Sequence, residues 1–146
     1  MDLKNRMISA SKNFQTSVNI AFDFDNAEKI AGFIPTSEAI KFIDDAISST
    51  RSTGFSEKNS SKSRAGILIG PYGKGKSYIV LETLSLLYNN PDLKDSFESL
   101  AQKVSEKNPY AAENILQYVK SGRRLLPIVI NGNSQSLSQS FLYALH

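Results

Sequence analysis

The stretch Gly70-Pro71-Tyr72-Gly73-Lys74-Gly75-Lys76-Ser77 decides the expected fold, because it is a complete G-x-x-x-x-G-K-[ST] signature. The apolar run 65–69 precedes it directly, and an apolar helical pattern over 78–88 follows it. Glycines at these positions permit positive φ angles and let the backbone approach a phosphate group closely. This strand, loop and helix order predicts a phosphate-binding loop rather than a chance match.

Each position of the loop has an expected contact. Lys76 is expected to reach the β- and γ-phosphate oxygens and is the one catalytic candidate, and the Ser77 hydroxyl is the expected ligand of Mg²⁺. Tyr72 and Lys74 could instead decorate the outer side of the loop. The predicted cofactors are ATP and Mg²⁺, with the choice between ATP and GTP left open. The residues predicted to contact the nucleotide are Gly70, Pro71, Tyr72, Gly73, Lys74, Gly75, Lys76, Ser77 and Tyr78.

The composition limits the other classes of chemistry. The 146 residues are 40% hydrophobic, enough for one core, and contain no apolar run of the length that spans a bilayer. The chain has no cysteine, no signal-like N-terminus and a single histidine, His146, which excludes thiolate sites and argues against zinc or a Ser-His-Asp site. The net charge of +3 comes from 17 basic residues scattered among 14 acidic ones, which favours a solvated surface over a nucleic-acid face. The expected location is the cytoplasm, without a membrane partner.

The first half of the chain predicts a lead-in and a linker. Residues 17–24 alternate apolar and polar side chains, which is typical of a half-buried strand. Thr36 is a candidate N-cap for a helix over 37–49. A run rich in Ser, Lys and Asn follows. The predicted organisation is a strand and helix lead-in over 1–50, a flexible linker over 51–64 and a partial nucleotide-binding domain over 65–146.

The second half predicts three more helices and a strand. Apolar residues line one side of a helix that opens at Pro91-Asp92 and stops before Asn108-Pro109. A further helix covers 110–121, with Gly122 at its C-terminus, and a last helix runs from about 135 to 145. The run 125–130 has the form of a buried parallel strand. The expected fold is therefore an α/β three-layer P-loop NTPase fold with a parallel sheet, present as its N-terminal portion.

An acidic strand that would hold Mg²⁺ and position water is missing after the loop. The run 125–130 ends in Ile130-Asn131, without an acid. A rearranged alternative places Asp23 at the end of an acidic strand before the loop. Arg123 and Arg124 could sense phosphate, but basic residues at a helix C-terminus more often complement the helix dipole.

The loop 67–77, together with Leu125-Leu126-Pro127-Ile128-Val129-Ile130-Asn131-Gly132-Asn133 after a helical insert, resembles the N-terminal part of AAA+-related ATPases. It is similar to the large ATP-binding proteins of bacterial phage-defence islands of the BREX type, which are similar to origin-recognition ATPases. The segment Phe33-Ile34-Pro35-Thr36 also resembles the segment that such proteins place ahead of the nucleotide site. The resemblance covers roughly residues 17–146, and the phosphate loop is its one highly specific motif.

The resemblance implies that the chain is part of a larger ATPase acting in nucleic-acid-directed defence against phage. Its implied partners are the nucleotide, other protein subunits or further C-terminal domains, and nucleic acid indirectly. The acidic strand, sensor residue and arginine finger of the family have no counterpart here, so whether this chain is itself an enzyme stays open, and a fragment is the favoured explanation. The alternatives are a small-molecule kinase and a nucleotide-gated binding module without turnover.

Overall fold

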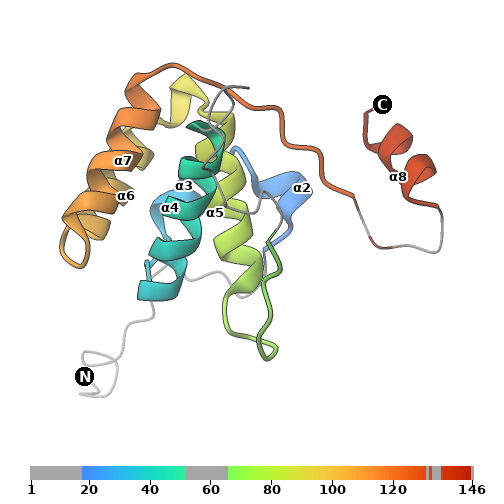
Figure 1. The fold of residues 1–146 in the computed structure, drawn as a ribbon, viewed down its shortest axis with the longest axis horizontal. Helices are drawn as coiled ribbons and strands as arrows, with labels where there is room; N and C mark the ends of the chain where they lie inside the picture. Colours follow the sequence, from blue (N-terminus) through green and yellow to red (C-terminus); the bar gives the residue numbers. More distant parts are fainter. Residues whose placement is uncertain (1–17, 52–65, 131, 133–135, 146) are drawn as a thin grey trace, which may run out of the picture.

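The fold is a helical bundle, seen in a computed structural model that describes residues 18–51, 66–130, 132 and 136–145. Its long helices are α4 (Ser37–Arg51), α5 (Lys76–Tyr88), α6 (Lys94–Ser105) and α7 (Pro109–Lys120). Two short helices, α2 (Ile20–Asp23) and α3 (Ala27–Ala31), pack beside α5, and the 3₁₀ turn η1 (Pro91–Leu93) leads into α6. Figure 1 shows α8 (Leu137–Ala144) apart from the bundle, at the end of an extended connection.

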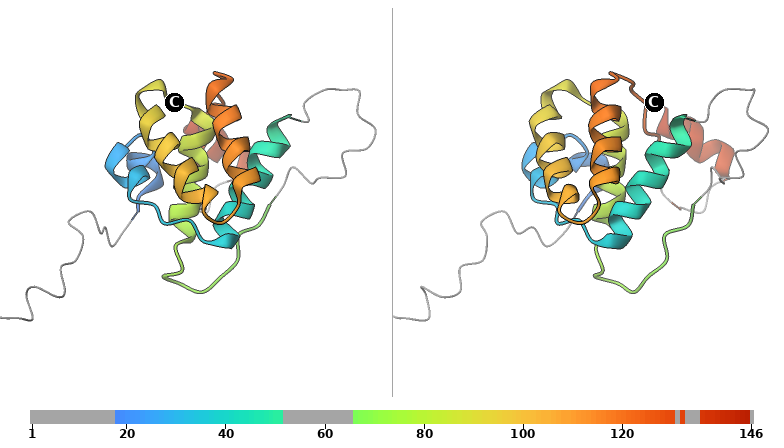
Figure 2. Two further views of the ribbon diagram at one scale, coloured as in Figure 1. Left: turned by 90° about the vertical axis from the view of Figure 1, so that its left-hand side faces the viewer. Right: turned by 60° about the vertical axis from the view of Figure 1, so that its left-hand side comes forward.

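The core lies between α4, α5, α6 and α7 and is closed on one side by α3. α6 and α7 run side by side, as both views in Figure 2 show, and α4 packs on α7 and α5. Phe97 of α6 is its largest fully buried side chain. Burying large apolar side chains stabilises by about 1.5–3 kcal/mol each, so this cluster provides most of the favourable free energy of the bundle. Its buried members are Ile30, Phe33, Ala39, Ile40, Ile43, Ile47, Leu86, Leu93, Phe97, Leu100, Ala101, Val104, Ala111, Ala112, Ile115 and Tyr118.

The helices begin and end where local hydrogen bonds satisfy their terminal backbone groups. Thr36 Oγ1 accepts a hydrogen bond from the Ala39 N–H (3.2 Å), and Asn108 Oδ1 accepts one from the Ala111 N–H (3.1 Å). Pro109 occupies the first turn of α7, where a missing N–H costs nothing. Gly122 follows α7 with φ +66°. The sequence predictions of helices at 37–49, 78–88, 91–107, 110–121 and 135–145 are confirmed, with ends shifted by a few residues.

The predicted parallel sheet is wrong. No strand occurs in the described ranges, and neither predicted strand at 65–69 or 125–130 forms a ladder. A strand needs a second segment to pair with its N–H and C=O groups, whereas each helix pairs its own. Among described residues of the run 125–130, Leu125 donates one backbone hydrogen bond to Leu87 O (2.9 Å), and the following residues make no backbone bond. Residues 66–69 and 125–130 form neither helix nor strand and are largely exposed, so the three-layer α/β assignment fails.

The predicted strand at 17–24 is also wrong, because its central residues 20–23 fold as α2. Asn19 caps this helix by accepting from the Ala21 N–H (3.2 Å), and its own N–H donates to the Asp23 carboxylate (2.7 Å). These bonds close a turn within five residues, and short polar side chains compete well in this way with extended structure. The Phe22 side chain, expected on the buried side of a strand, is exposed.

The predicted lead-in and the predicted nucleotide-binding region contribute to one core. Ile30, Ile43 and Ile47 from the first pack with Leu86 and Phe97 from the second. The division at 51–64 stays a prediction, because residues 52–65 lie outside the described ranges, as do residues 1–17.

The described helices are short. The longest, α4, has 15 residues, and no described helix combines the length and apolarity needed to cross a bilayer. The predicted cytoplasmic location remains a prediction.

Candidate functional site

The loop before α5 has a backbone that two glycines make possible. Gly73 has φ +78° and Gly75 has φ +77° with ψ 13°, both in the left-handed region that side chains with a Cβ rarely adopt. Gly75 is also the residue from which α5 begins, since its carbonyl accepts from the N–H groups of Tyr78 and Ile79 (both 3.0 Å). The loop hangs from the end of the bundle, as Figure 2 shows. Its exposed backbone can therefore approach a ligand without moving the core.

Lys76 folds back over this loop. Its Nζ donates hydrogen bonds to the carbonyl oxygens of Gly70 (2.8 Å) and Pro71 (2.7 Å). An ammonium held by two neutral carbonyls is less well neutralised than one beside anions, and charge-assisted bonds to phosphate are roughly twice as strong as neutral ones. An arriving phosphate would therefore draw the ammonium away from the carbonyls toward itself.

The start of α5 is left open on its positive end. Gly75 provides no side-chain cap, and the first turn of the helix carries no acidic residue. The first N–H groups of a helix lack partners within the helix, and the macrodipole adds positive potential there. Ser77 is exposed in this first turn, one residue after Lys76. The arrangement can accept an anion on the backbone and offers a hydroxyl beside it.

The other predicted contacts fall into two groups. Gly70, Pro71, Tyr72, Gly73 and Lys74 are all exposed in the loop, and the Tyr72 side chain is fully so. Their predicted roles stay predictions.

Tyr78 points the other way. Its hydroxyl donates to the Lys29 carbonyl of α3, and its ring meets the Phe33 ring edge-on at 5.3 Å. Burial raises the pKa of the Tyr78 hydroxyl, and the Glu82 carboxyl nearby acts in the same direction. Its side chain is therefore part of the packing between α3 and α5. The predicted contact of Tyr78 with nucleotide stays a prediction.

The lead-in is attached along the whole length of α5. Besides the Tyr78 contact, Ser85 donates its hydroxyl to the Phe24 carbonyl, and the Phe24 and Tyr88 rings lie edge-on with centroids 4.9 Å apart. These contacts fix the orientation of α5, the helix that follows the predicted phosphate-binding loop. The sequence pattern did not indicate them, because they join residues about 50 to 60 positions apart.

Asp23 is engaged within the lead-in. Its carboxylate pairs with the Lys29 ammonium and also accepts from the Asn19 N–H (2.7 Å). The hydrogen bond from Lys29, then that from Asn19, lowers the pKa of Asp23. The acidic strand proposed for it does not exist, since Asp23 closes the helix α2. The rearranged alternative, in which Asp23 is the acid at the end of a strand, is therefore wrong.

Glu82 is the residue that the motif analysis missed. It is completely buried in α5, and neither carboxyl oxygen has a hydrogen-bond partner in the structure. Burial raises the pKa of Glu82 to about 8, with the Lys103 ammonium acting in the opposite direction. The helical spacing could have indicated its burial, because Glu82 lies four residues from Tyr78 and from Leu86 on one face of α5.

Arg123 and Arg124 bind backbone carbonyls. Arg123 Nη2 donates to Thr50 O (3.2 Å), and Arg124 Nε donates to Tyr88 O (3.3 Å) with its guanidinium 5.0 Å from the Tyr88 ring centroid. Arg124 thus complements the C-terminal carbonyls of α5 rather than those of α7. Both contacts favour a structural role over phosphate sensing.

The described residues contain no group of three or more His, Cys, Asp or Glu side chains that could hold a metal ion. The predicted Mg²⁺ ligand, Ser77, would therefore need the phosphates of a nucleotide as its co-ligands. The chain matches no family model, no curated protein and no solved structure.

Proposed function

We propose that the chain binds a nucleoside triphosphate with Mg²⁺ through residues 70–77. Lys76 contacts the β- and γ-phosphates, the N–H groups of the loop and of the first turn of α5 surround them, and Ser77 completes the Mg²⁺ shell. ATP is the expected nucleotide.

One observation carries the proposal: the Lys76 side chain reaches back across the loop that precedes the uncapped start of α5. Gly73 and Gly75, with their positive φ angles, give this loop its shape. Most helices begin with a side-chain cap or an acidic first turn, and both would repel or displace an anion. The uncapped start of α5 and its glycines are arranged instead for a ligand that supplies the missing acceptors.

Isothermal titration of the purified chain with Mg-ATP tests this proposal. Lys76→Ala is expected to weaken binding about 30-fold, since a charged contact to phosphate contributes about 2 kcal/mol. Lys120→Ala is the control, because Lys120 is an exposed lysine at the end of α7, outside the predicted nucleotide contacts, and it should change the affinity by no more than about 3-fold. Absence of binding by the wild-type chain, or equal losses in the two variants, would contradict the proposal.

The proposal is limited to binding and does not include hydrolysis by this chain. Asp23, the acid that the sequence offered for positioning water, is held by Lys29 and Asn19. Phosphoryl transfer depends on positioned charges, and an arginine finger alone contributes about 10³- to 10⁵-fold in rate. We therefore expect slow turnover or none.

The cellular role proposed from the sequence resemblance is a nucleotide-driven subunit in defence against phage. Plaque formation on the native host compares deletion of the gene with a Lys76→Ala allele. Equal loss of protection in both supports the role, and unchanged plaque formation in both refutes it.

A further inference from the structure

The C-terminal part of the chain carries an apolar surface without any charge. No Asp, Glu, Lys or Arg occurs from Leu125 to Leu145. Within the described residues of this range, nine large apolar side chains are between 36% and 76% exposed. We call this set the C-terminal surface; it comprises Leu125, Leu126, Ile128, Ile130, Leu137, Phe141, Leu142, Tyr143 and Leu145.

The extended part of the C-terminal surface, residues 126–130, has no backbone hydrogen-bond partner among the described residues. From 126 to 130, exposed Leu126, Ile128 and Ile130 alternate with half-buried Pro127 and Val129, which is the period of a strand with one open side. No backbone hydrogen bond of the described chain involves these residues. Such a segment can pair with another extended segment.

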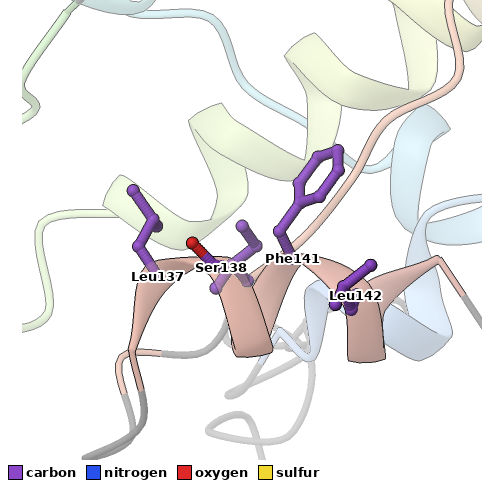
Figure 3. A pocket seen from close by; sticks show the side chains of 5 residues that line it. Leu137, Ser138, Phe141 and Leu142 are labelled. Atoms are coloured by element: carbon purple, nitrogen blue, oxygen red, sulfur yellow. The ribbon is translucent and has the colours of Figure 1, made fainter.

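The helical part adds a hollow beside this segment. Leu137 and Phe141, four residues apart in α8, project from the same side of the helix, as Figure 3 shows. Together with Ile130, Ser138 and Leu142 they line a hollow of about 550 Å³. None of the α8 side chains is buried. The helix therefore presents its apolar side to solvent. Most amphipathic helices gain their stability by packing this side against another element.

The size of the surface matches one side of a stable interface. At roughly 150 Å² for a fully exposed large side chain, the nine residues expose an area on the order of 700 Å². The largest apolar patch of a typical monomer is about 300–600 Å², whereas a standard interface buries about 800 Å² on each partner. The C-terminal surface is thus larger than an ordinary monomer patch and approaches the size of one side of an interface.

We propose that the C-terminal surface binds a second copy of this chain, with segment 126–130 and helix α8 of each copy packed against the same elements of the other. Two identical uncharged surfaces meet without like-charge repulsion, whereas interfaces between different proteins usually gain their specificity from complementary charges. A two-fold axis also gives both copies the same contacts from one patch.

The two-fold arrangement satisfies the open backbone as well. Antiparallel pairing of 126–130 with its own copy supplies N–H and C=O partners to both chains. Phe141 and Leu137 of each copy can then pack into the hollow of the other copy. A second copy of this chain is therefore sufficient to cover the surface.

Analytical ultracentrifugation of the full chain between about 1 and 100 µM tests the proposal. The wild type is expected to be a dimer in the upper part of this range. Phe141→Lys should raise the dimer dissociation constant at least about 10-fold, because it brings two charges together at the two-fold contact. Phe22→Lys is the matched control: Phe22 is an exposed phenylalanine on α2, outside the C-terminal surface, and its replacement should leave the dimer unchanged. Equal far-UV circular dichroism of the three proteins checks that all remain folded.

Cross-linking locates the contact independently. The chain has no cysteine, so a single added thiol is the sole target of a bifunctional maleimide reagent. Leu142→Cys is expected to give a covalent dimer, and Phe22→Cys is expected to stay monomeric under the same conditions.

A wild type that stays monomeric at the highest concentration overturns the proposal. So does a dimer that Phe141→Lys does not weaken, and so does a growing series of oligomers in place of a closed dimer.

Discussion

Replacing Glu82 by leucine should stabilise the fold and remove most of its pH dependence between pH 5 and pH 8. The Glu82 carboxyl is completely buried without a hydrogen-bond partner, and burial raises its pKa from 4.5 to about 8. Leucine has a similar size, favours helices, and leaves no polar group in the core.

The sign of the effect follows from proton uptake. Between pH 4.5 and 8 the folded chain keeps the Glu82 proton, whereas the unfolded chain has lost it. Stability therefore falls as the pH rises through this range, by about 1.4 kcal/mol per pH unit at most. The loss is about 3 to 4 kcal/mol between pH 5 and pH 8, a large part of the 5–15 kcal/mol typical of a domain.

The assay is urea unfolding followed by far-UV circular dichroism at pH 5, 6, 7 and 8. The wild-type free energy of unfolding should fall steadily, and that of Glu82→Leu should stay nearly level and exceed the wild type most at pH 8. Glu98→Leu is the control, because Glu98 is an exposed carboxylate of α6, and its curve should run parallel to that of the wild type. A wild-type stability that is level or rises over this range, or a parallel fall in Glu82→Leu, would refute the reasoning.

Three further predictions concern the core, the loop and the lead-in. Phe97→Ala should lower the free energy of unfolding by about 3–5 kcal/mol in urea titrations, because Phe97 is the largest fully buried side chain. Gly75→Ala should cost about 1–2 kcal/mol and weaken Mg-ATP binding in calorimetry, since φ is +77° there, whereas Gly66→Ala, with equally open space and no positive φ, should do neither. Asp23→Asn should lower stability at pH 7 and flatten the stability curve below about pH 4 in acid titrations. The hydrogen bond from Lys29 lowers the pKa of Asp23 in the folded chain below the unfolded value of 3.8. The stabilisation that the Asp23 carboxylate provides is therefore present above pH 3.8 and is lost as the pH falls through the pKa of the folded chain.

At 17–24, hydrogen bonds of local polar side chains outweigh the strand tendency of alternating apolar residues. Val18, Ile20 and Phe22 fit one side of a strand by spacing, yet Asn19 and Asp23 close a helical turn through bonds within five residues. The spacing of the apolar residues favours a strand, whereas the side chains of the interleaved Asn and Asp favour a helical turn.

The sequence by itself determined the helices from α4 to α8 and the glycine positions of the loop before α5, because their hydrogen bonds and backbone angles are local. The side chains of Thr36 and Asn108 start their helices by accepting from backbone N–H groups three residues away. Gly73 and Gly75 take their positive φ angles within the loop that the motif marks. Tertiary structure decided the rest. Whether 125–130 becomes a strand depends on a distant partner segment, and none is present in the described residues. The burial of Glu82, and the attachment of α5 to α3 through Tyr78 and the Lys29 carbonyl, likewise arise where helices distant in sequence pack together.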